Sequence, residues 1–246
     1  MRLRIAALFL IFATETACHA ADVDSTLKAL QDVGQKLNDF SADIRQTEND
    51  GLANDRIHAG RVYFQRTADG SARIHVILDQ RISNGKISNN EKNEFLLDGP
   101  ILIDRNYRTK SQAKHTVLKE GQKLDLFKIG KGPFPLPIGQ DPAEVQRAFD
   151  VKVVPPGKDD LPKSTHAVLT PKPGSPLERK FKSIDIWVDD ATHMPMRVDT
   201  VDKQGKYQST ELSKLVLNPR GGLKDADFAL PPIDNSWNRS VDDYHD

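Results

Sequence analysis

The hydrophobic residues near the start of the chain repeat with the period of a helix. Apolar or small side chains recur every three or four positions, which places them on one face of a helix expected over residues 24–38. Asp24 or Ser25 is expected to cap this helix. The positions that form the stripe are Leu27, Leu30, Val33 or Gly34, and Leu37. An amphipathic helix of this kind needs an apolar surface to cover.

From Phe40 onward the period changes to two, which is typical of strands. Phe40, Ala42 and Ile44 alternate with polar residues as far as a turn signal at residues 49–51. Further alternating or β-rich runs follow, mostly separated by Gly, Asn, Asp or Pro, at residues 61–66, 73–80, 94–98, 101–105, 107–119, 151–154, 165–170, 181–189, 194–202 and 207–217. Such runs favour antiparallel pairing, because parallel pairing would need crossover helices that the chain mostly lacks. The expected fold class is mainly β (α+β), with a curved antiparallel sheet.

A second helix is predicted near the middle of the chain. Asp141 is expected to cap it, Pro142 to occupy its first turn, and Glu144 to complete a capping box, with Val145 and Phe149 on one side. The proline-rich residues 132–139 before it are not expected to form regular structure. Two helices give little cover for a sheet of about ten strands, so part of its apolar face could stay open as a ligand pocket. The pattern alone favours a closed sandwich with a packed core over such a pocket.

The first twenty residues resemble a secretory signal peptide. Arg2 and Arg4 precede an apolar run, and Cys18-His19-Ala20 has small residues at the positions required before a cleavage site. A lipid-attachment site is not favoured, because the position three residues before Cys18 is Glu15. We therefore expect residues 1–20 to be removed and residues 21–246 to form a single soluble domain in the periplasm.

Removal of residues 1–20 would take the only cysteine with it, so no disulfide or cysteine metal site is expected. The 35 basic and 35 acidic residues of the whole chain become 33 and 34. This balance argues against a nucleic-acid partner, which would require a clustered basic excess.

Other catalytic or cofactor signatures are weak. The histidines show no metal-binding spacing, no G-x-S-x-G turn presents a serine, and no complete phosphate-binding glycine loop occurs. The acid pairs at residues 189–190 and 242–243 are neighbours in sequence, so they are interpreted as solvated turn or tail residues. We expect no enzyme activity, no cofactor and no metal.

The order of the segments resembles the periplasmic outer-membrane lipoprotein carrier family, here called LolA-like. Residues 40–47 (FSADIRQT) and 60–66 (GRVYFQR) resemble the two opening strands of that family. Residues 97–104 (LDGPILID) resemble its D-G hairpin, and residues 166–172 (HAVLTPK) its L-T-P-K strand. The segments at 181–186 (FKSIDI) and 227–232 (DFALPP) complete a resemblance that covers nearly all of residues 25–232.

The resemblance implies an incomplete barrel of about eleven antiparallel strands, closed by helices over an apolar cavity that takes up acyl chains. It also implies an inner-membrane ABC transporter that loads the carrier and an outer-membrane acceptor that unloads it. The protein is expected to act as a monomer. The chain departs from the family pattern at residues 67–75 and 103–105, and it has extra residues at 83–93 and 155–163. These departures bear on the cargo and the partners rather than on the fold.

Candidate cavity residues follow from strand alternation. Val62, Phe64 and Arg66 share one strand face. Arg66, which also matches the family's arginine, would reach lid carbonyls or a cargo head group from the rim, or else be a solvated strand end. The candidate apolar wall residues, for each of which plain core packing is the alternative, are Phe40, Ile44, Val62, Phe64, Ile74, Val76, Leu78, Leu97, Ile101, Ile103, Ile184, Ile186, Val188, Met196 and Val198.

Three functions remain open from the sequence. The first is a carrier that binds the acyl chains of lipoproteins or lipids and shuttles them toward the outer membrane. The second is a lipid-binding regulatory or sensor module of the periplasm. The third is a hydrolase on a β scaffold, which should show a convergent catalytic triad in the structure.

Overall fold

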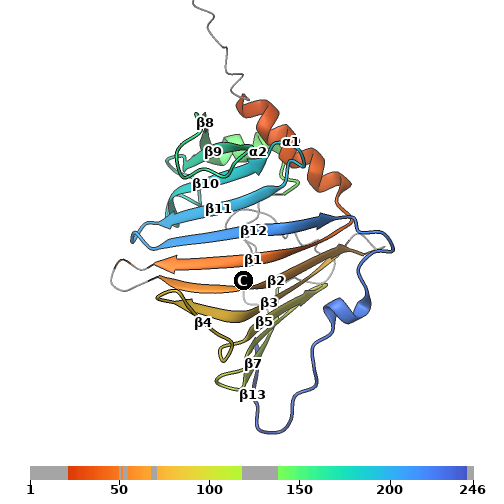
Figure 1. The fold of residues 1–246 in the computed structure, drawn as a ribbon. Helices are drawn as coiled ribbons and strands as arrows, with labels where there is room; N and C mark the ends of the chain where they lie inside the picture. Colours follow the sequence, from red (N-terminus) through yellow and green to blue (C-terminus); the bar gives the residue numbers. More distant parts are fainter. Residues whose placement is uncertain (1–21, 50, 52–54, 68–70, 118–137, 243–246) are drawn as a thin grey trace, which may run out of the picture.

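One large curved sheet dominates the computed structural model, which describes residues 22–49, 51, 55–67, 71–117 and 138–242 (Figure 1). Residues 1–20, with the predicted signal peptide, lie outside the described residues. The helices are α1 (Val23–Lys36), α2 (Pro142–Ala148) and the short 3-10 helix η1 (Asp225–Phe228). The strands in chain order are β1 (Asp39–Asn49), β2 (Arg56–Arg66), β3 (Ala72–Ser83), β4 (Lys86–Ser88), β5 (Asn93–Asp98), β6 (Ile101–Asn106), β7 (Ser111–Thr116), β8 (Phe149–Val154), β9 (Ser164–Pro171), β10 (Phe181–Asp189), β11 (Pro195–Asp202), β12 (Tyr207–Leu217) and β13 (Asn238–Asp242).

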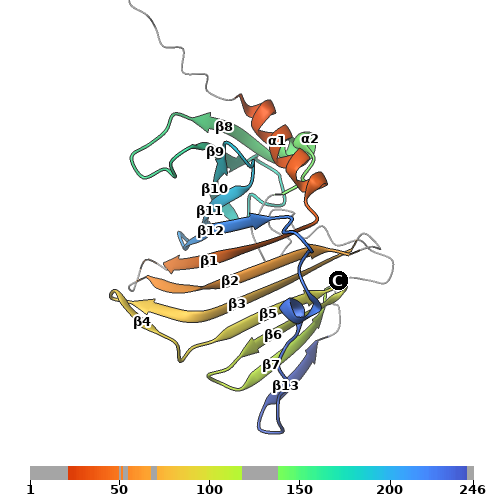
Figure 2. The ribbon, with the colours of Figure 1, turned by 45° about the vertical axis from the view of Figure 1, so that its right-hand side comes forward.

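The described strands form a single sheet of thirteen, in the order β13-β7-β6-β5-β3-β2-β1-β12-β11-β10-β9-β8, with β4 paired to β3. The expected mainly β, curved and antiparallel architecture is confirmed. Its edge differs from the prediction, because β13 pairs with β7 in parallel. The chain reaches this position through the long segment after β12, which contains η1 and passes alongside the sheet (Figure 2).

Both helices lie close to where the sequence predicts them. The cap of α1 is Asp22, rather than Asp24 or Ser25, and its carboxylate accepts a hydrogen bond from the Ser25 amide at 2.6 Å. Asp141 caps α2 as expected, and Pro142 begins it. Phe149 ends α2 and starts β8, so it belongs to the strand rather than to the helix.

The predicted strand at 107–119 is wrong in its first part, because residues 107–110 form a turn before β7. The Asn106 side chain accepts a hydrogen bond from the Thr109 amide at 2.9 Å, and Lys110 has a positive φ of 47°. This side-chain bond stabilises a turn where the residue pattern alone favours a strand. Residues 118–137, which include most of the proline-rich segment, lie outside the described residues.

The concave face of the sheet is the one that carries Phe40, Ala42 and Ile44. Directly opposite residues on antiparallel strands share a face, and Phe40 is opposite Phe64, which is opposite Ile74. On this same face, Gln46 of β1 and Ser240 of β13 line one cavity although five strands separate β1 from β13. Strands that far apart can enclose a common space only if the sheet curves toward it.

Both helices pack on the concave side, as predicted. Leu27 and Leu30 of α1 and Val145 of α2 belong to the same buried cluster as Phe40 and Ile184 of the sheet. Figure 1 shows α1 lying across the end of the sheet formed by β8 to β10. The apolar stripe of α1 therefore packs on the concave apolar face, at the end formed by β8 and β9.

The C-terminal segment packs on the convex face of β3, β5 and β6. The His75 ring bonds to the Asp227 carbonyl oxygen at 2.7 Å, and the Arg105 guanidinium donates to the Pro231 carbonyl at 2.6 Å. Arg73 pairs with Asp225 at 2.6 Å. These contacts lead the chain to the sheet edge where β13 pairs.

Candidate functional site

Most of the predicted wall residues meet in one place, the apolar part of the concave face. They lie on strands β1 to β3, β5 and β10 to β11, and they form one cluster with the apolar residues of α1. In the structure most of them are buried rather than exposed in an open cavity. The predicted residues that this cluster contains are Phe40, Ile44, Val62, Phe64, Ile74, Val76, Leu78, Leu97, Ile184, Ile186, Val188 and Val198, with Met196 packed against them and partly buried.

Ile101 and Ile103 lie on the opposite face, so their prediction as wall residues is wrong. Leu97 is opposite Leu102, whereas Ile103 is opposite Leu96. The hairpin loop contains only residues 99–100, so Asp98 faces Ile101 and the concave position on β6 falls to Leu102. The length of this loop is a signal in the sequence from which Leu102 can be identified.

Arg66 ties the end of α1 to the rim of the sheet. Its Nη2 donates a hydrogen bond to the Gly34 carbonyl oxygen at 2.9 Å, and its Nε donates to the Leu37 carbonyl oxygen at 3.3 Å. The last carbonyls of a helix lack partners within the helix, and a cation is favoured at this end. Of the two interpretations of Arg66, the geometry therefore supports contact with the lid.

A close backbone contact also positions α1. The Gly139 amide donates to the Leu30 carbonyl oxygen at 2.9 Å. A Cβ atom added to Gly34 would lie 2.3 Å from the Gly139 Cα, and Gly139 itself has a φ of +74°. Glycine at both positions lets the helix approach the chain that leads into α2.

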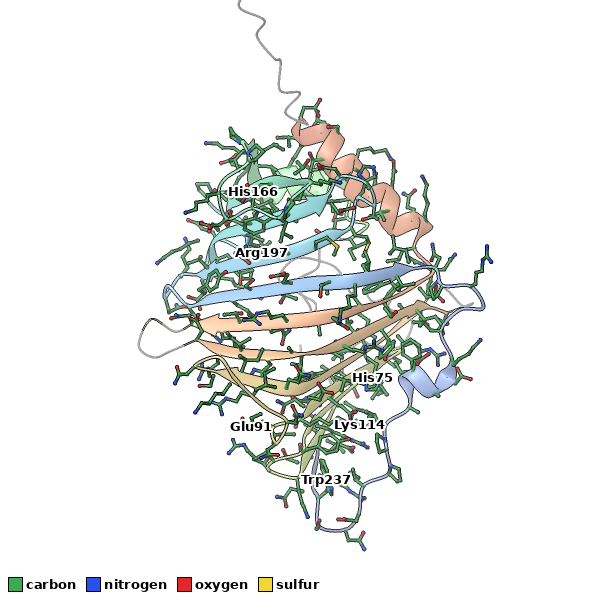
Figure 3. All side chains as sticks on the ribbon, viewed as in Figure 1. His75, Glu91, Lys114, His166, Arg197 and Trp237 are labelled. Atoms are coloured by element: carbon green, nitrogen blue, oxygen red, sulfur yellow. The ribbon has the colours of Figure 1, made fainter. Side chains whose placement is uncertain are left out.

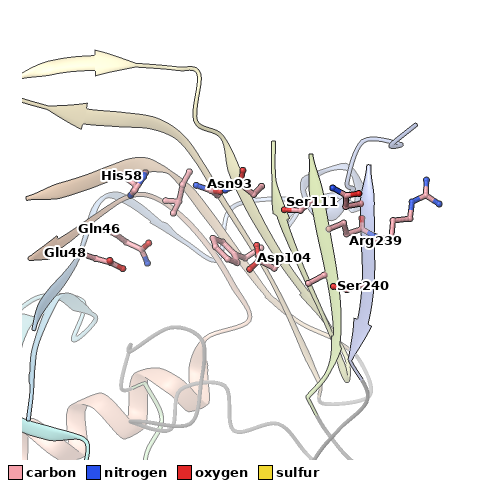
Figure 4. A pocket seen from close by; sticks show the side chains of 14 residues that line it. Gln46, Glu48, His58, Asn93, Asp104, Ser111, Arg239 and Ser240 are labelled. Carbon is pink, nitrogen blue, oxygen red and sulfur yellow. The ribbon is translucent and has the colours of Figure 1, made fainter. Parts of the chain in front are cut away.

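The far end of the concave face is polar and hollow. A cavity of about 540 Å³ opens there, and Figure 4 shows side chains from several strands that point into it. Polar lining residues from β1, β2, β5 and β6 are Gln46, His58, Asn93 and Asp104. Gln46 follows Phe40, Ala42 and Ile44 at the same alternation, so the pattern of β1 indicates a polar end to this face that the sequence analysis did not use.

Burial disfavours charge on two groups that line this cavity. Burial raises the pKa of the Asp104 carboxyl group, although the nearby His115 partly offsets the effect. Burial and the charge of Arg81 lower the pKa of the His58 imidazole. Both shifts favour the neutral form of the side chain.

No known protein-family profile matches the chain, and no curated protein matches it in sequence. Solved structures with a similar fold exist at low identity. The structure of MucB is 12% identical and has a TM-score of 0.51, and the match covers 87% of this chain and 64% of MucB. In the Pseudomonas aeruginosa MucA/MucB complex the match covers 61% of the other chain, so this chain spans less than two thirds of those proteins.

Two further solved structures match most of the chain at low identity. A LolA superfamily protein from Nitrosomonas europaea is 11% identical, with a TM-score of 0.33, and the match covers 86% of this chain and 99% of that one. Lipoprotein LppX from Mycobacterium tuberculosis is also 11% identical, with a TM-score of 0.41 and coverage of 80% and 96%. The fold is similar to that of MucB. One curved, open sheet with two α-helices on its concave side forms the incomplete barrel.

A second polar cluster lies on the other face of the sheet. The His166 ring stacks on Trp187 at 4.2 Å between centroids, and Arg197 lies 4.3 Å above the Trp187 ring. The two ring nitrogens of His166 lie 3.3 Å from Asp160 Oδ1 and 3.0 Å from Asp185 Oδ1. Figure 3 shows His166 and Arg197 at one end of the sheet, far from His75 and Trp237.

This cluster has no evident nucleophile. Among the described residues, no serine or threonine hydroxyl is hydrogen-bonded to a histidine ring, and the His166 nitrogens both face carboxylates. The part of the chain that the structure describes holds no group of three or more His, Cys, Asp or Glu side chains arranged to bind a metal ion. No described helix has the length and apolar character needed to span a membrane.

Proposed function

We propose that this protein is a periplasmic carrier whose concave apolar face binds the acyl chains of lipoproteins or lipids and shuttles them toward the outer membrane. The observation that carries the proposal is the position of α1 over that face. The apolar stripe of an amphipathic helix belongs to one buried cluster with sheet residues such as Phe40 and Ile184, and hydrogen bonds from Arg66 hold the end of that helix. A covering element of this kind can be displaced by an apolar ligand that competes for the same surface.

Acyl chains and the α1 stripe would occupy the same surface in turn. Covered and loaded states then bury similar apolar area, so the free energy of exchange stays small and cargo can be taken up and released. The bonds from Arg66 to the carbonyls of Gly34 and Leu37 exist only in the covered state. They favour release of cargo, because an ionised donor strengthens a hydrogen bond.

Export to the periplasm and partner proteins in both membranes are also part of the proposed function. The signal-like residues 1–20 support export to the periplasm. An inner-membrane ABC transporter would load the carrier and an outer-membrane acceptor would unload it, while the carrier itself acts as a monomer and is not an enzyme. It needs no metal and no cofactor.

Vesicle transfer tests this function directly. The purified protein is mixed with donor vesicles that contain a fluorescent acylated peptide and with acceptor vesicles that contain none. A carrier should accelerate transfer in proportion to its concentration, and organic extraction of the purified protein should yield a lipid identifiable by mass spectrometry. Transfer at the rate without protein, together with no extracted lipid, would contradict the proposal.

A regulatory module is the second candidate function. MucB, whose fold is similar, has been crystallised in complex with MucA. A module of that kind would bind the acylated peptide without accelerating its transfer between vesicles. The same vesicle experiment therefore separates the two functions.

A further inference from the structure

The concave face divides along its strands into an apolar end and a polar end. On β1, Phe40 and Ile44 are 1% and 2% exposed and belong to the core, whereas Gln46 lines the polar cavity. Gln46 is seven positions along β1 from Asp39, which lies next to the end of α1, and this spans roughly 23 Å at about 3.3 Å per residue. Leu78 and Phe95 line the cavity and also contact the core, so the two ends are continuous.

The cavity offers hydrogen-bonding groups that the fold does not use. The side chains of Gln46, Asn93 and Asp104 form no hydrogen bond with another described residue. Thr210, directly across from Gln46 on β12, is 0% exposed, and its hydroxyl group has no hydrogen-bond partner among the described residues. Gln46, Asn93 and Asp104 are half-buried, so their polar groups remain available to hydrogen-bond a ligand in the cavity, whereas Thr210 is not one of the lining residues.

The charges around the cavity do not suit an anion. Among the described lining residues, only Arg239 carries a permanent positive charge, and its Nη2 already donates to the carbonyls of Ile233 and Asp234 at 3.3 Å each. Glu48 adds a carboxylate, which Arg56 and Lys206 balance at 3.7 and 3.5 Å. Recognition of a phosphate would require uncommitted arginine or lysine side chains in the cavity.

We propose that this cavity is a subsite for the uncharged, hydroxyl-rich head group, such as a glycosyl group, of an amphiphile whose acyl chain lies on the apolar part of the concave face. Amide side chains both donate and accept hydrogen bonds, as hydroxyl groups do, so Gln46 and Asn93 match several hydroxyls at once. This inference rests on the proposed acyl-chain binding. It adds selectivity for the head group, which an apolar surface cannot supply.

The test compares binding of three fluorescent probes that share one acyl chain and carry a methyl ester, a glucosyl or a phosphate head group. The full-length protein should bind the glucosyl probe about ten-fold more tightly than the methyl ester, because two or three net hydrogen bonds suffice for that difference. The phosphate probe should bind no better than the methyl ester. In the double variant Gln46→Leu, Asn93→Leu the glucosyl preference should disappear while methyl ester binding persists.

Thr47→Leu is the matched control, since it adds a leucine to the opposite face of β1 and should keep the preference. Methyl ester binding in each variant also reports whether the protein is folded. Equal binding of the methyl ester and glucosyl probes by the original protein would overturn the subsite and leave the carrier function standing. A preference for phosphate, or a glucosyl preference that survives in the double variant, would also overturn it. Failure to bind any probe would overturn the carrier function and the subsite together.

Discussion

At the scale of single residues, Arg66 has the most direct influence on the proposed exchange of lid and cargo. Its guanidinium bonds to the carbonyls of Gly34 and Leu37 are lost when α1 moves away. Arg66→Leu should therefore destabilise the covered state and slow the dissociation of an acyl probe about 5- to 30-fold, which corresponds to roughly 1–2 kcal/mol for an exposed charged donor. Stopped-flow displacement of the bound probe measures this rate.

Two variants control for the loss of an arginine. Arg66→Lys should give an intermediate rate, because lysine keeps the charge but lacks the planar fork. Arg45→Leu removes an exposed arginine from the other face of β1 and should leave the rate unchanged. A dissociation rate in Arg66→Leu that equals or exceeds the original one would show that Arg66 does not hold the lid.

Asp160, on the convex face, is expected to stabilise the folded protein in a way that depends on pH. Burial works to raise the pKa of Asp160, but hydrogen bonds from the Gly157 amide and from Trp187 Nε1, together with His166, outweigh it, so the pKa lies below its usual value. A lowered carboxyl pKa adds stability that is complete above the unfolded value of about 3.9 and is lost as the pH falls through the folded value.

Asp160→Asn should therefore lower the free energy of unfolding by about 1 kcal/mol at pH 7, because the neutral amide accepts weaker hydrogen bonds. As the pH falls below about 4, the difference from the original protein should shrink, because Asp160 is protonated first in the unfolded chain and then, at its lowered pKa, in the folded protein. Urea unfolding of both proteins across this range measures the effect. A difference in the free energy of unfolding that stays constant down to the lowest pH measured would contradict a lowered pKa for Asp160.

At the scale of elements, the seating of α1 depends on Gly34. An alanine there would place its Cβ 2.3 Å from the Gly139 Cα, so the helix must move outward or the backbone must shift. Gly34→Ala should destabilise the α1 contact by roughly 1–3 kcal/mol, the usual range for overpacking. Amide hydrogen exchange in α1 should accelerate while exchange in β1 and β2 stays slow.

Gln35→Ala is the matched control, since Gln35 is exposed on the same turn of α1 and its substitution creates no clash. Exchange in α1 should stay slow in this variant. If Gly34→Ala also leaves α1 exchange unchanged, the close contact with Gly139 does not position the helix.

The sequence predicts elements well where one period dominates. The alternation of Phe40, Ala42 and Ile44 and the stripe that contains Leu27 locate β1 and α1 within one or two residues of their observed bounds. Prediction from the sequence fails where a local hydrogen bond or a distant pairing strand determines the local structure. The Asn106 side chain converts the start of a predicted strand into a turn, and β13 exists only because the C-terminal segment reaches the edge at β7.

Prediction of the candidate site from the sequence is limited in the same way. Alternation within each strand identifies which side chains share a face, and it groups Val62, Phe64 and Arg66. Relating the faces of two strands requires the register across the turn between them, and an error of one residue there placed Ile101 and Ile103 on the wrong side. That the wall residues pack beneath α1 follows from tertiary contacts that no local pattern specifies.

At the scale of the whole molecule, the curved sheet presents one continuous amphipathic surface. Its apolar end lies under α1 and α2, and its polar end forms the cavity beside β13 (Figure 4). Large apolar side chains that are exposed elsewhere, Ile87, Val216 and Val241, are scattered over separate strands. The proposed binding of an acyl chain would use this extended apolar surface of the described residues, and α1 would have to move to open it.

Photo-crosslinking with a fatty acid that carries a diazirine at its chain end tests this claim most directly. After irradiation, the labelled positions are identified by tandem mass spectrometry. Labels should fall on concave side chains such as Phe40, Val62 and Ile186, and excess unlabelled fatty acid should suppress them. Labels on Ile87, Val216 or Val241 in place of these residues, or labelling that excess fatty acid does not reduce, would contradict acyl-chain binding beneath α1.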